Sequence, residues 1–202
     1  MRAVVQRVLS ASVEVSVVFN PLQHRSSRAR DLSSNLLLQV EGRVVSAIGP
    51  GLLVLVGVHE ADTDADADFI CRKVLNMRLF PNEKTGKAWD QSVTQRNFEV
   101  LLVSQFTLYG ILKGNKPDFH VAMPPAKAKP FYAALVEKFQ RSYSAETVKD
   151  GVFGAMMKVS LVNDGPVTMQ VDSPSLQGAA QSSNGDDGSV RDGETRVPKE
   201  AC

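Results

Sequence analysis

Histidine, cysteine and net charge are all scarce in this chain of 202 residues. It has three histidines, two cysteines and a formal net charge of +1. A charge so close to zero gives no overall basic field of the kind that marks many nucleic-acid-binding proteins. The cysteines, Cys71 and Cys202, lie far apart in the sequence, so we expect reduced thiols and a cytoplasmic protein.

Long hydrophobic runs are also missing. The apolar run over residues 51–58 is far shorter than the ~20 residues that cross a bilayer. No apolar signal-peptide segment follows Arg2. We therefore expect no secretory signal and no membrane contact, and we interpret residues 51–58 as a core strand.

An acidic cluster at Asp64, Asp66 and Asp68 has no matching His or Glu, so we expect no metal and no other cofactor. These carboxylates instead suit the positive end of a helix over residues 64–77, which Asp62 or Thr63 can cap.

The remaining periodic segments predict an α+β fold with a mainly antiparallel sheet that curves or closes into a barrel. Proline suits a first helical turn, so Pro124-Pro125 predicts the start of a second helix that ends near Arg141. A turn at Asp150-Gly151 leads into a last hairpin. We expect strands at residues 2–8, 12–15, 43–48, 52–58, 78–80 and 98–103.

Two segments do not fit a compact domain. Residues 173–202 are rich in Ser, Gly, Asp and Gln and predict a disordered tail after a domain at 1–172. Residues 16–40 interrupt that domain. Joining Val15 to Glu41 would give a hairpin with a Glu41-Gly42 turn, which favours a foreign insertion at the hairpin tip. The alternative is a genuine RNA-binding loop that uses Arg25, Arg28 and Arg30.

The stretch Asn163-Asp164-Gly165-Pro166-Val167-Thr168 separates two apolar, β-prone segments at 155–162 and 167–171. Gly165 has no Cβ and Pro166 has no backbone donor, so the pair can bend the chain sharply and leave carbonyl oxygens facing outward. A plain hairpin turn explains the same residues.

A second polar stretch, Ser104-Gln105-Phe106-Thr107-Leu108, follows an apolar strand, where functional sites are often built. Its hydroxyls suggest a nucleophile, but a hydroxyl nucleophile normally needs an adjacent base. Neither stretch contains a histidine, and the chain has no Gly-x-Ser-x-Gly elbow. A pairing of Ser104 with His120 stays open; the other histidines are His24 and His59.

Five motifs in one order give a family resemblance. Besides SQFTL at 104–108 and NDGPVT at 163–168, they are AIGPG at 47–51, KGNKPDF at 113–119 and KDGVFG at 149–154. Together with the start of the chain they resemble the D-aminoacyl-tRNA deacylases, over residues 1–15 and about 41–174.

The resemblance implies a site built mainly from backbone. The Phe106 N–H, beside Ser104, Gln105 and Thr107, would stabilise the oxyanion. The carbonyls of Gly165 and Pro166, joined by a cis bond and supplied by the partner subunit of a homodimer, would grip the substrate amine and exclude an L side chain. Water activation would fall to the 2′-OH of the tRNA. Arg7 and Asn163 would support the Gly-Pro motif, and Phe119 and Ala128 would line the pocket.

The resemblance implies the hydrolysis of D-aminoacyl-tRNA and of glycine mischarged on non-cognate tRNA, with aminoacyl-tRNA and a second copy as partners and no DNA. Lys113, Asn115 and Lys116 form a small basic loop that can meet phosphate or simply be solvated. Two other functions stay open: a non-catalytic RNA-binding dimer, and an esterase with a Ser or Thr nucleophile.

Overall fold

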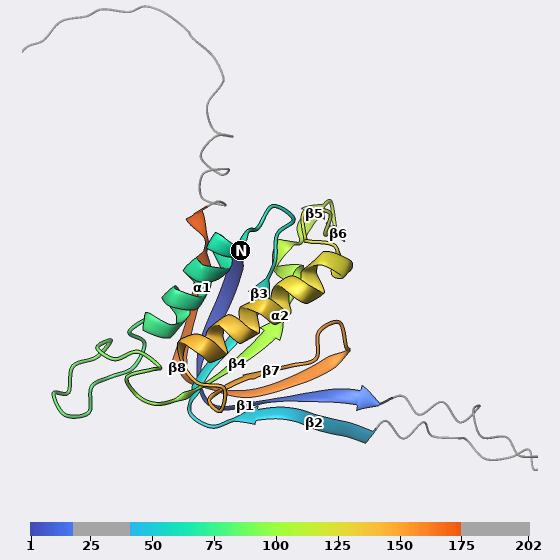
Figure 1. Ribbon diagram of the computed structural model, residues 1–202. Coiled ribbons are helices and arrows are strands. Elements are labelled where there is room, and N and C mark those ends of the chain that lie inside the picture. The colour runs from blue at the N-terminus through green and yellow to red at the C-terminus, as the bar shows by residue number, and fades with distance from the viewer. Residues whose placement is uncertain (18–40, 175–202) are drawn as a thin grey trace, which may run out of the picture.

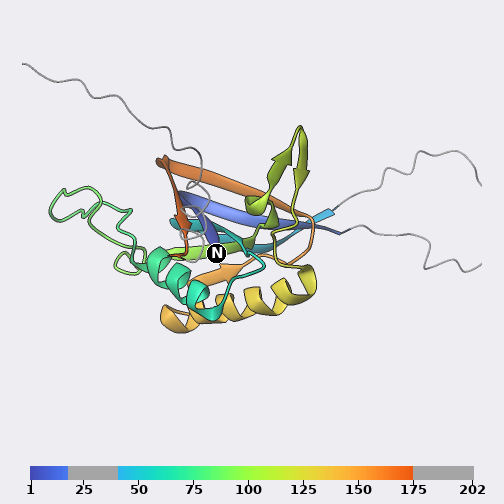
Figure 2. The same cartoon turned by 90° about the horizontal axis from the view of Figure 1, so that it is seen from above.

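The computed structural model describes residues 1–17 and 41–174, which form a curved sheet with two helices on one face (Figures 1 and 2). This confirms the α+β class with a mainly antiparallel, barrel-like sheet. The elements follow one another along the chain in the order β1 (Arg2–Val17), β2 (Glu41–Ile48), β3 (Gly51–Gly57), α1 (Asp64–Asn76), β4 (Glu99–Ser104), the 3₁₀ helix η2 (Phe106–Tyr109), β5 (Ile111–Lys113), β6 (Lys116–Asp118), α2 (Pro125–Ser142), β7 (Val148–Asp150) and β8 (Met157–Asp172).

The long strand β1 organises the sheet because it pairs with three others, all antiparallel. Its first half pairs with β3, from Arg2 opposite Gly57 to Val8 opposite Gly51. Its second half pairs with β2, and β8 runs along both halves. Since a strand has two edges, β8 must occupy the edge opposite β2 and β3. The two strands predicted at 2–8 and 12–15 are thus one.

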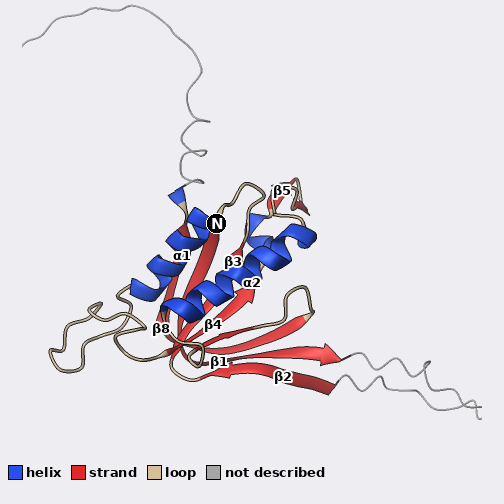
Figure 3. Cartoon of the chain, viewed as in Figure 1, coloured by secondary structure: helices blue, strands red, loops and turns tan. Residues whose placement is uncertain are grey.

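The rest of the sheet is parallel. β4 pairs with β3, and β7 pairs with β4. Parallel neighbours need a crossover connection, usually a helix. Here α1 lies in the connection from β3 to β4, and α2 in that from β4 to β7. Both connections step in the same direction across the sheet, and crossovers of one hand that do so place their helices on the same face (Figure 3).

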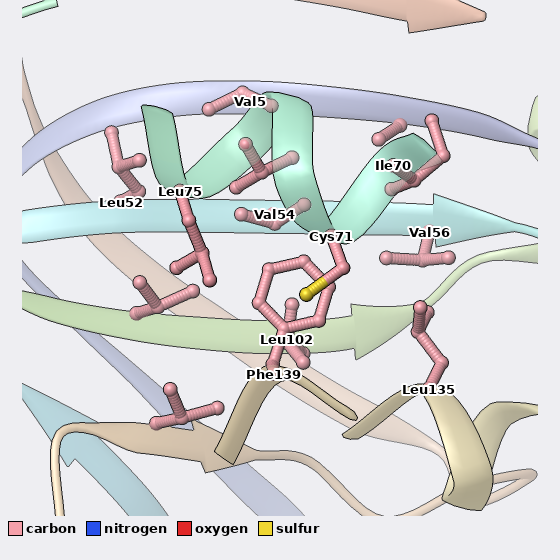
Figure 4. Packing of buried hydrophobic residues seen from close by; sticks show 14 of the residues in the cluster. Val5, Leu52, Val54, Val56, Ile70, Cys71, Leu75, Leu102, Leu135 and Phe139 are labelled. Atoms are coloured by element: carbon pink, nitrogen blue, oxygen red, sulfur yellow. The ribbon is translucent and has the colours of Figure 1, made fainter. Parts of the chain in front are cut away.

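Adjacent residues of the central strands enter different cores. Val54 and Leu102 pack with Ile70 of α1 and Phe139 of α2 in the larger cluster (Figure 4). Leu53, by contrast, packs in a second cluster on the other face of the sheet. Burial on both faces explains why residues 51–58 form one continuous apolar run rather than an alternating one.

Both helix starts follow from their sequences. Thr63 is the N-cap of α1, and its N–H donates to the carboxylate of Asp66 at 2.9 Å. Asp64 and Asp66 stand in the first turn, where the helix dipole favours them. Asp68 pairs with Lys138 of α2. The described part of the chain holds no group of three or more residues suited to a metal ion. The start of α2 at Pro125 matches the prediction.

Two local predictions were wrong. Residues 78–80 do not form a strand; apart from one isolated bridge between Phe80 and Gln91 they pair with nothing in the described sheet. Leu79 and Phe80 are nevertheless buried, so their apolar character reflects core packing rather than a ladder. The last hairpin expected after the Asp150-Gly151 turn is not formed either, because its two predicted strands belong to the single strand β8, which pairs with β1 on both sides of Gly165-Pro166.

The boundaries of the two predicted irregular segments shift slightly. Ser16 and Val17 continue β1 and pair with Gly42 and Glu41. The rest of the predicted insertion, 18–40, lies outside the described residues, as does the tail from 175 onward. Ser173 belongs to the folded domain, since it is buried and its N–H donates to the Met1 carbonyl at 2.8 Å. No described helix is long and apolar enough to cross a membrane.

Candidate active site

The Gly165-Pro166 pair lies within β8, and it is not a hairpin turn. The residues before and after it pair with the same strand: Asn163 lies opposite Val8, and Thr168 lies opposite Gln6. Four residues of β8, 164–167, therefore stand opposite Arg7 alone and must bulge out of the ladder. The Gly165-Pro166 peptide bond is cis. We call residues 164–167 the Gly-Pro bulge.

Glycine is required at position 165 for two reasons. Its φ of +113° is in a region that L side chains rarely adopt. A Cβ there would also lie 2.8 Å from Cγ2 of Val167 and 3.2 Å from its backbone nitrogen. The bulge therefore has no room for a larger residue at this position.

Arg7 lies directly behind the bulge. Its Nε is 2.8 Å from Oδ2 of Asp164, and its Nη1 donates to the Leu79 carbonyl at 2.6 Å. The guanidinium carbon lies 6.0 Å from the ring centres of both Phe80 and Trp89. With only 14% of its side chain exposed, Arg7 is built into the structure rather than being an ordinary surface arginine.

Asn163, just before the bulge, carries a buried amide oxygen. Among the residues that the structure describes, this oxygen has no hydrogen-bond donor. An unpaired buried acceptor costs about 1–3 kcal/mol, so a donor from outside the described chain would stabilise it.

The second motif begins at the carboxyl end of β4. Ser104 is the last residue of the strand, and the Gln105 N–H donates to the Val56 carbonyl of β3 at 2.7 Å. Phe106 then opens η2, and the first N–H groups of a helix have no partner within it. Phe106 and Thr107 are exposed, whereas Tyr109 is buried. The motif thus presents its first turn to solvent while its end anchors in the core.

Arg2 holds the end of this motif in place. Its Nη1 donates to the Leu108 carbonyl at 3.1 Å, and its Nε lies 2.7 Å from Oδ1 of Asp172 in β8. Burial raises the pKa of the neighbouring Tyr109, so this phenol stays protonated at neutral pH. Sequence reasoning missed Arg2, and the only available signal was its place on the first strand.

The hydroxyls of the motif have no basic partner in the described structure. The side-chain amide of Gln105 donates to Oγ1 of Thr107. His120 pairs with Asp118 at 3.0 Å, and the ring of His59 packs against Tyr109 at 5.2 Å. The proposed pairing of Ser104 with His120 is therefore not formed.

Of the two predicted lining residues, Phe119 contacts the motif directly. Its ring meets that of Phe106 edge to face, with 4.9 Å between centroids. Ala128 is buried within the first turns of α2. A hollow of about 890 Å³ lies away from both motifs, between α1 and the end of α2.

The two motifs lie far apart within one chain. Gln105 bonds to Val56, which lies opposite Ala3 of β1, whereas the Gly-Pro bulge lies opposite Arg7. Four residues of strand separate these points, or roughly 13 Å at about 3.3 Å per residue. The structure thus brings Gln105, Phe106, Thr107 and Phe119 together, and separately Arg7, Asn163, Gly165 and Pro166.

Comparison with known proteins agrees with these motifs. Residues 4–172 match the family model described as D-Tyr-tRNA(Tyr) deacylase. The chain is 46% identical over 173 residues to a D-aminoacyl-tRNA deacylase of Dictyostelium discoideum, covering 86% of this chain and 98% of the relative. It is 45% identical over 180 residues to D-aminoacyl-tRNA deacylase 1 of Bos taurus, covering 89% and 74%.

Solved structures show the same fold. One described as a c-Myc DNA unwinding element binding protein is 44% identical, with a TM-score of 0.71, over 86% of this chain and 99% of that one. Another, described as a probable eukaryotic D-amino acid tRNA deacylase, shares the fold at 15% identity, with a TM-score of 0.64 over 85% of this chain and 98% of that one. The family match over nearly the whole described structure, with relatives above 40% identity, shows that the chain belongs to the D-Tyr-tRNA(Tyr) deacylase family.

Proposed function

We propose that this enzyme hydrolyses the ester bond of D-aminoacyl-tRNA, releases free tRNA and the D-amino acid, and so proofreads chirality in translation. The observation that carries the proposal is the exposed Phe106-Thr107 turn, whose first backbone N–H groups have no partner within η2 and whose hydroxyls have no side-chain base beside them among the described residues. Such a turn suits a reaction in which the enzyme supplies oxyanion stabilisation and the substrate supplies the base.

In the proposed reaction, water attacks the ester carbonyl and the 3′ oxygen of the terminal ribose leaves. The adjacent 2′-OH of the tRNA activates the water, so no histidine is needed. The Phe106 N–H donates to the oxyanion that forms on the carbonyl oxygen. Loss of one such donor typically costs ~10²–10³ in rate.

Selection for handedness is assigned to the Gly-Pro bulge. The carbonyls of Gly165 and Pro166 would hold the α-amine and fill the space that an L side chain needs. A steric block of this kind discriminates by repulsion as well as by lost attraction. Glycine carries no side chain, so the same site would also accept glycine mischarged on a non-cognate tRNA.

The bulge would act on a second copy of the chain. Within one chain, the bulge lies opposite Arg7 of β1, whereas Gln105 lies level with Ala3. At a rise of about 3.3 Å per residue, these two points are roughly 13 Å apart along β1, so the bulge does not reach the Phe106 turn of its own chain. The outer edge of β8 also has no strand partner among the described residues, and it bears the exposed side chains of Leu161, Val162 and Met169. Unpaired strand edges favour association with another chain. A cytoplasmic homodimer is therefore part of the proposal.

The test is deacylation of D-Tyr-tRNA against L-Tyr-tRNA by the purified chain. We expect rapid release of D-tyrosine and release of L-tyrosine close to the spontaneous rate. Equal rates on the two substrates would overturn the chiral assignment. No hydrolysis of either, with tRNA binding retained, would favour the non-catalytic RNA-binding function.

A further inference from the structure

The stretch of chain that includes the Phe106 turn has an excess of positive charge, although the protein as a whole is nearly neutral. Residues 105–130 contain four lysines and one carboxylate, whereas the rest of the chain has 19 Lys and Arg against 21 Asp and Glu. Lys113 and Lys116 lie on the β5–β6 hairpin, and Lys127 and Lys129 lie in the first two turns of α2.

The β5–β6 hairpin and the first turns of α2 lie at the same end of the molecule as the Phe106 turn (Figures 1 and 2). The contact between the rings of Phe119 and Phe106 connects the base of the hairpin to η2. The Met123 N–H donates to the Val58 carbonyl at 3.0 Å, which fixes the segment before α2 to the exit of β3. The lysines therefore lie beside the Phe106 turn and not on a distant surface.

Three of these lysines are exposed and have no carboxylate partner among the residues described: Lys116, Lys127 and Lys129. Lys113 pairs with Asp118, the only carboxylate in the stretch. Elsewhere in the fold, Lys87 pairs with Asp90 and Lys138 with Asp68. The free ammonium groups are thus available to an anion from outside the protein.

Lys127, in the first turn of α2, is also placed where the helix dipole disfavours a positive charge. Lysine near a helix N-terminus opposes the dipole, which favours carboxylates there. The first turn of α1 obeys this rule with Asp64 and Asp66, whereas the first turn of α2 has no acidic residue. Residues that break a local stability rule are expected at functional positions.

We propose that Lys116, Lys127 and Lys129 form a phosphate-binding rim that holds the acceptor end of the tRNA while its esterified terminal ribose lies at the Phe106 turn. This rests on the proposed function. Because the chain has no overall basic field, the backbone phosphates next to the terminal nucleotide need local cations. Lysines that neutralise phosphates release condensed counterions, which makes binding depend on salt.

The test compares two double variants with equal charge change. Lys127→Gln/Lys129→Gln removes two rim charges. Lys73→Gln/Arg141→Gln removes two exposed cations from the last turns of α1 and α2, away from the rim. Binding of deacylated tRNA is measured against salt concentration. Deacylation is measured on D-Tyr-tRNA and on D-tyrosyl-adenosine, which has no phosphate.

For the rim variant we expect a decrease of between one and two in the salt slope, since each phosphate contact contributes about 0.7–0.9. Its kcat/KM on D-Tyr-tRNA should fall about tenfold or more at low salt, while that on D-tyrosyl-adenosine stays unchanged. Its melting temperature should not fall, because the positive charge of Lys127 no longer opposes the helix dipole. The single variant Lys116→Gln should lower the salt slope by about 0.7–0.9, the contribution of one phosphate contact.

An equal loss of tRNA binding in the control variant would overturn the rim, because net charge alone would then explain the effect. An equal loss on D-tyrosyl-adenosine would overturn it too, since the substitutions would then act on the chemistry. Failure of the wild-type chain to hydrolyse D-Tyr-tRNA would overturn the proposed function instead. The salt slope on deacylated tRNA would still decide whether the rim exists.

Discussion

Thr107 separates a backbone mechanism from a nucleophilic one. Its hydroxyl is exposed and accepts a hydrogen bond from Gln105, and no histidine adjoins it in the described structure. We expect Thr107→Ala to deacylate D-Tyr-tRNA within a few-fold of the wild-type rate, whereas loss of a true nucleophile can cost ~10⁶. Single-turnover deacylation measures this. An acyl-enzyme trapped on Thr107 or Ser104 and seen by mass spectrometry would contradict it.

Gly165 tests the Gly-Pro bulge directly. In Gly165→Ala, the new Cβ would lie 2.8 Å from Cγ2 of Val167 and 3.3 Å from Nη2 of Arg7, at a φ of +113°. The bulge must shift to relieve this contact, so we expect D-Tyr-tRNA deacylation to fall more than tenfold, about 1.4 kcal/mol or more in transition-state stabilisation. The measurement is kcat/KM.

The control for this variant is Gly154→Ala. Gly154 also has a positive φ, +75°, but a Cβ there meets nothing within 4 Å. It should lower stability through backbone strain alone and leave kcat/KM unchanged. Equal activity losses in the two variants would mean that strain, rather than the position of the bulge, causes the effect.

At the level of the elements, Gly51 fixes the junction between β3 and β4. A Cβ at this position would lie 2.0 Å from the backbone oxygen of Glu99, so Gly51→Ala must separate the paired strands. We expect a loss of at least about 1–3 kcal/mol in the free energy of unfolding, the usual cost of overpacking. Denaturant unfolding measures it.

The matched control lies two residues earlier in the same motif. A Cβ at Gly49 would meet only the carboxylate of Glu99, at an ordinary 3.6 Å, and the Gly49 N–H could keep its bond to that carboxylate. Gly49→Ala should therefore stay within about 0.5 kcal/mol of wild type. A similar loss in both variants would show that the turn, and not the close strand approach, limits stability.

The elements that were predicted correctly are those whose signal is local. Thr63 and Asp66 mark the start of α1, Pro125 marks the start of α2, and residues 51–58 form an apolar run of strand length. For the Gly-Pro bulge a plain hairpin turn stayed open as an alternative, because two β-prone segments around Gly-Pro look the same in either case. Only the identity of the partner strand, β1 for both segments, distinguishes them.

The residues of the candidate site were likewise predictable only where their signal is local. The Ser104–Leu108 stretch was found because its polar residues follow an apolar strand and because it forms part of a family pattern. Arg2 and Trp89, which hold η2 and cover Arg7, were missed. Their contacts join residues more than 80 positions apart in the sequence, and no local pattern encodes such a pairing.

The arrangement of the whole molecule makes the proposed site depend on two chains. Each chain carries one Phe106 turn and one Gly-Pro bulge on different parts of its surface. A symmetric dimer would combine them into two equivalent sites, each with a turn from one subunit and a bulge from the other. Activity should then be recoverable from two chains that are each inactive for a different reason.

The complementation test uses Gly165→Ala, which damages the bulge, and Phe106→Pro, which removes the proposed oxyanion donor. Proline is tolerated at the first position of a helix, so η2 should still form. Phe106→Ala serves as the control, because it loses the ring contact with Phe119 but keeps the N–H. The Gly165→Ala and Phe106→Pro homodimers should each deacylate D-Tyr-tRNA poorly, and the rate of Phe106→Pro should fall ~10²–10³-fold. The rate of the Phe106→Ala control should fall much less.

Co-expression of the two inactive chains should form mixed dimers by random pairing. In a mixed dimer, the wild-type turn of the Gly165→Ala chain would face the wild-type bulge of the Phe106→Pro chain, while the other site carries both defects. Half of the dimers are then mixed and half of their sites are intact, so activity should return to about a quarter of wild type. Mixed dimers detected by native mass spectrometry without any recovered activity would place the turn and the bulge of one site in the same chain and contradict the cross-subunit site.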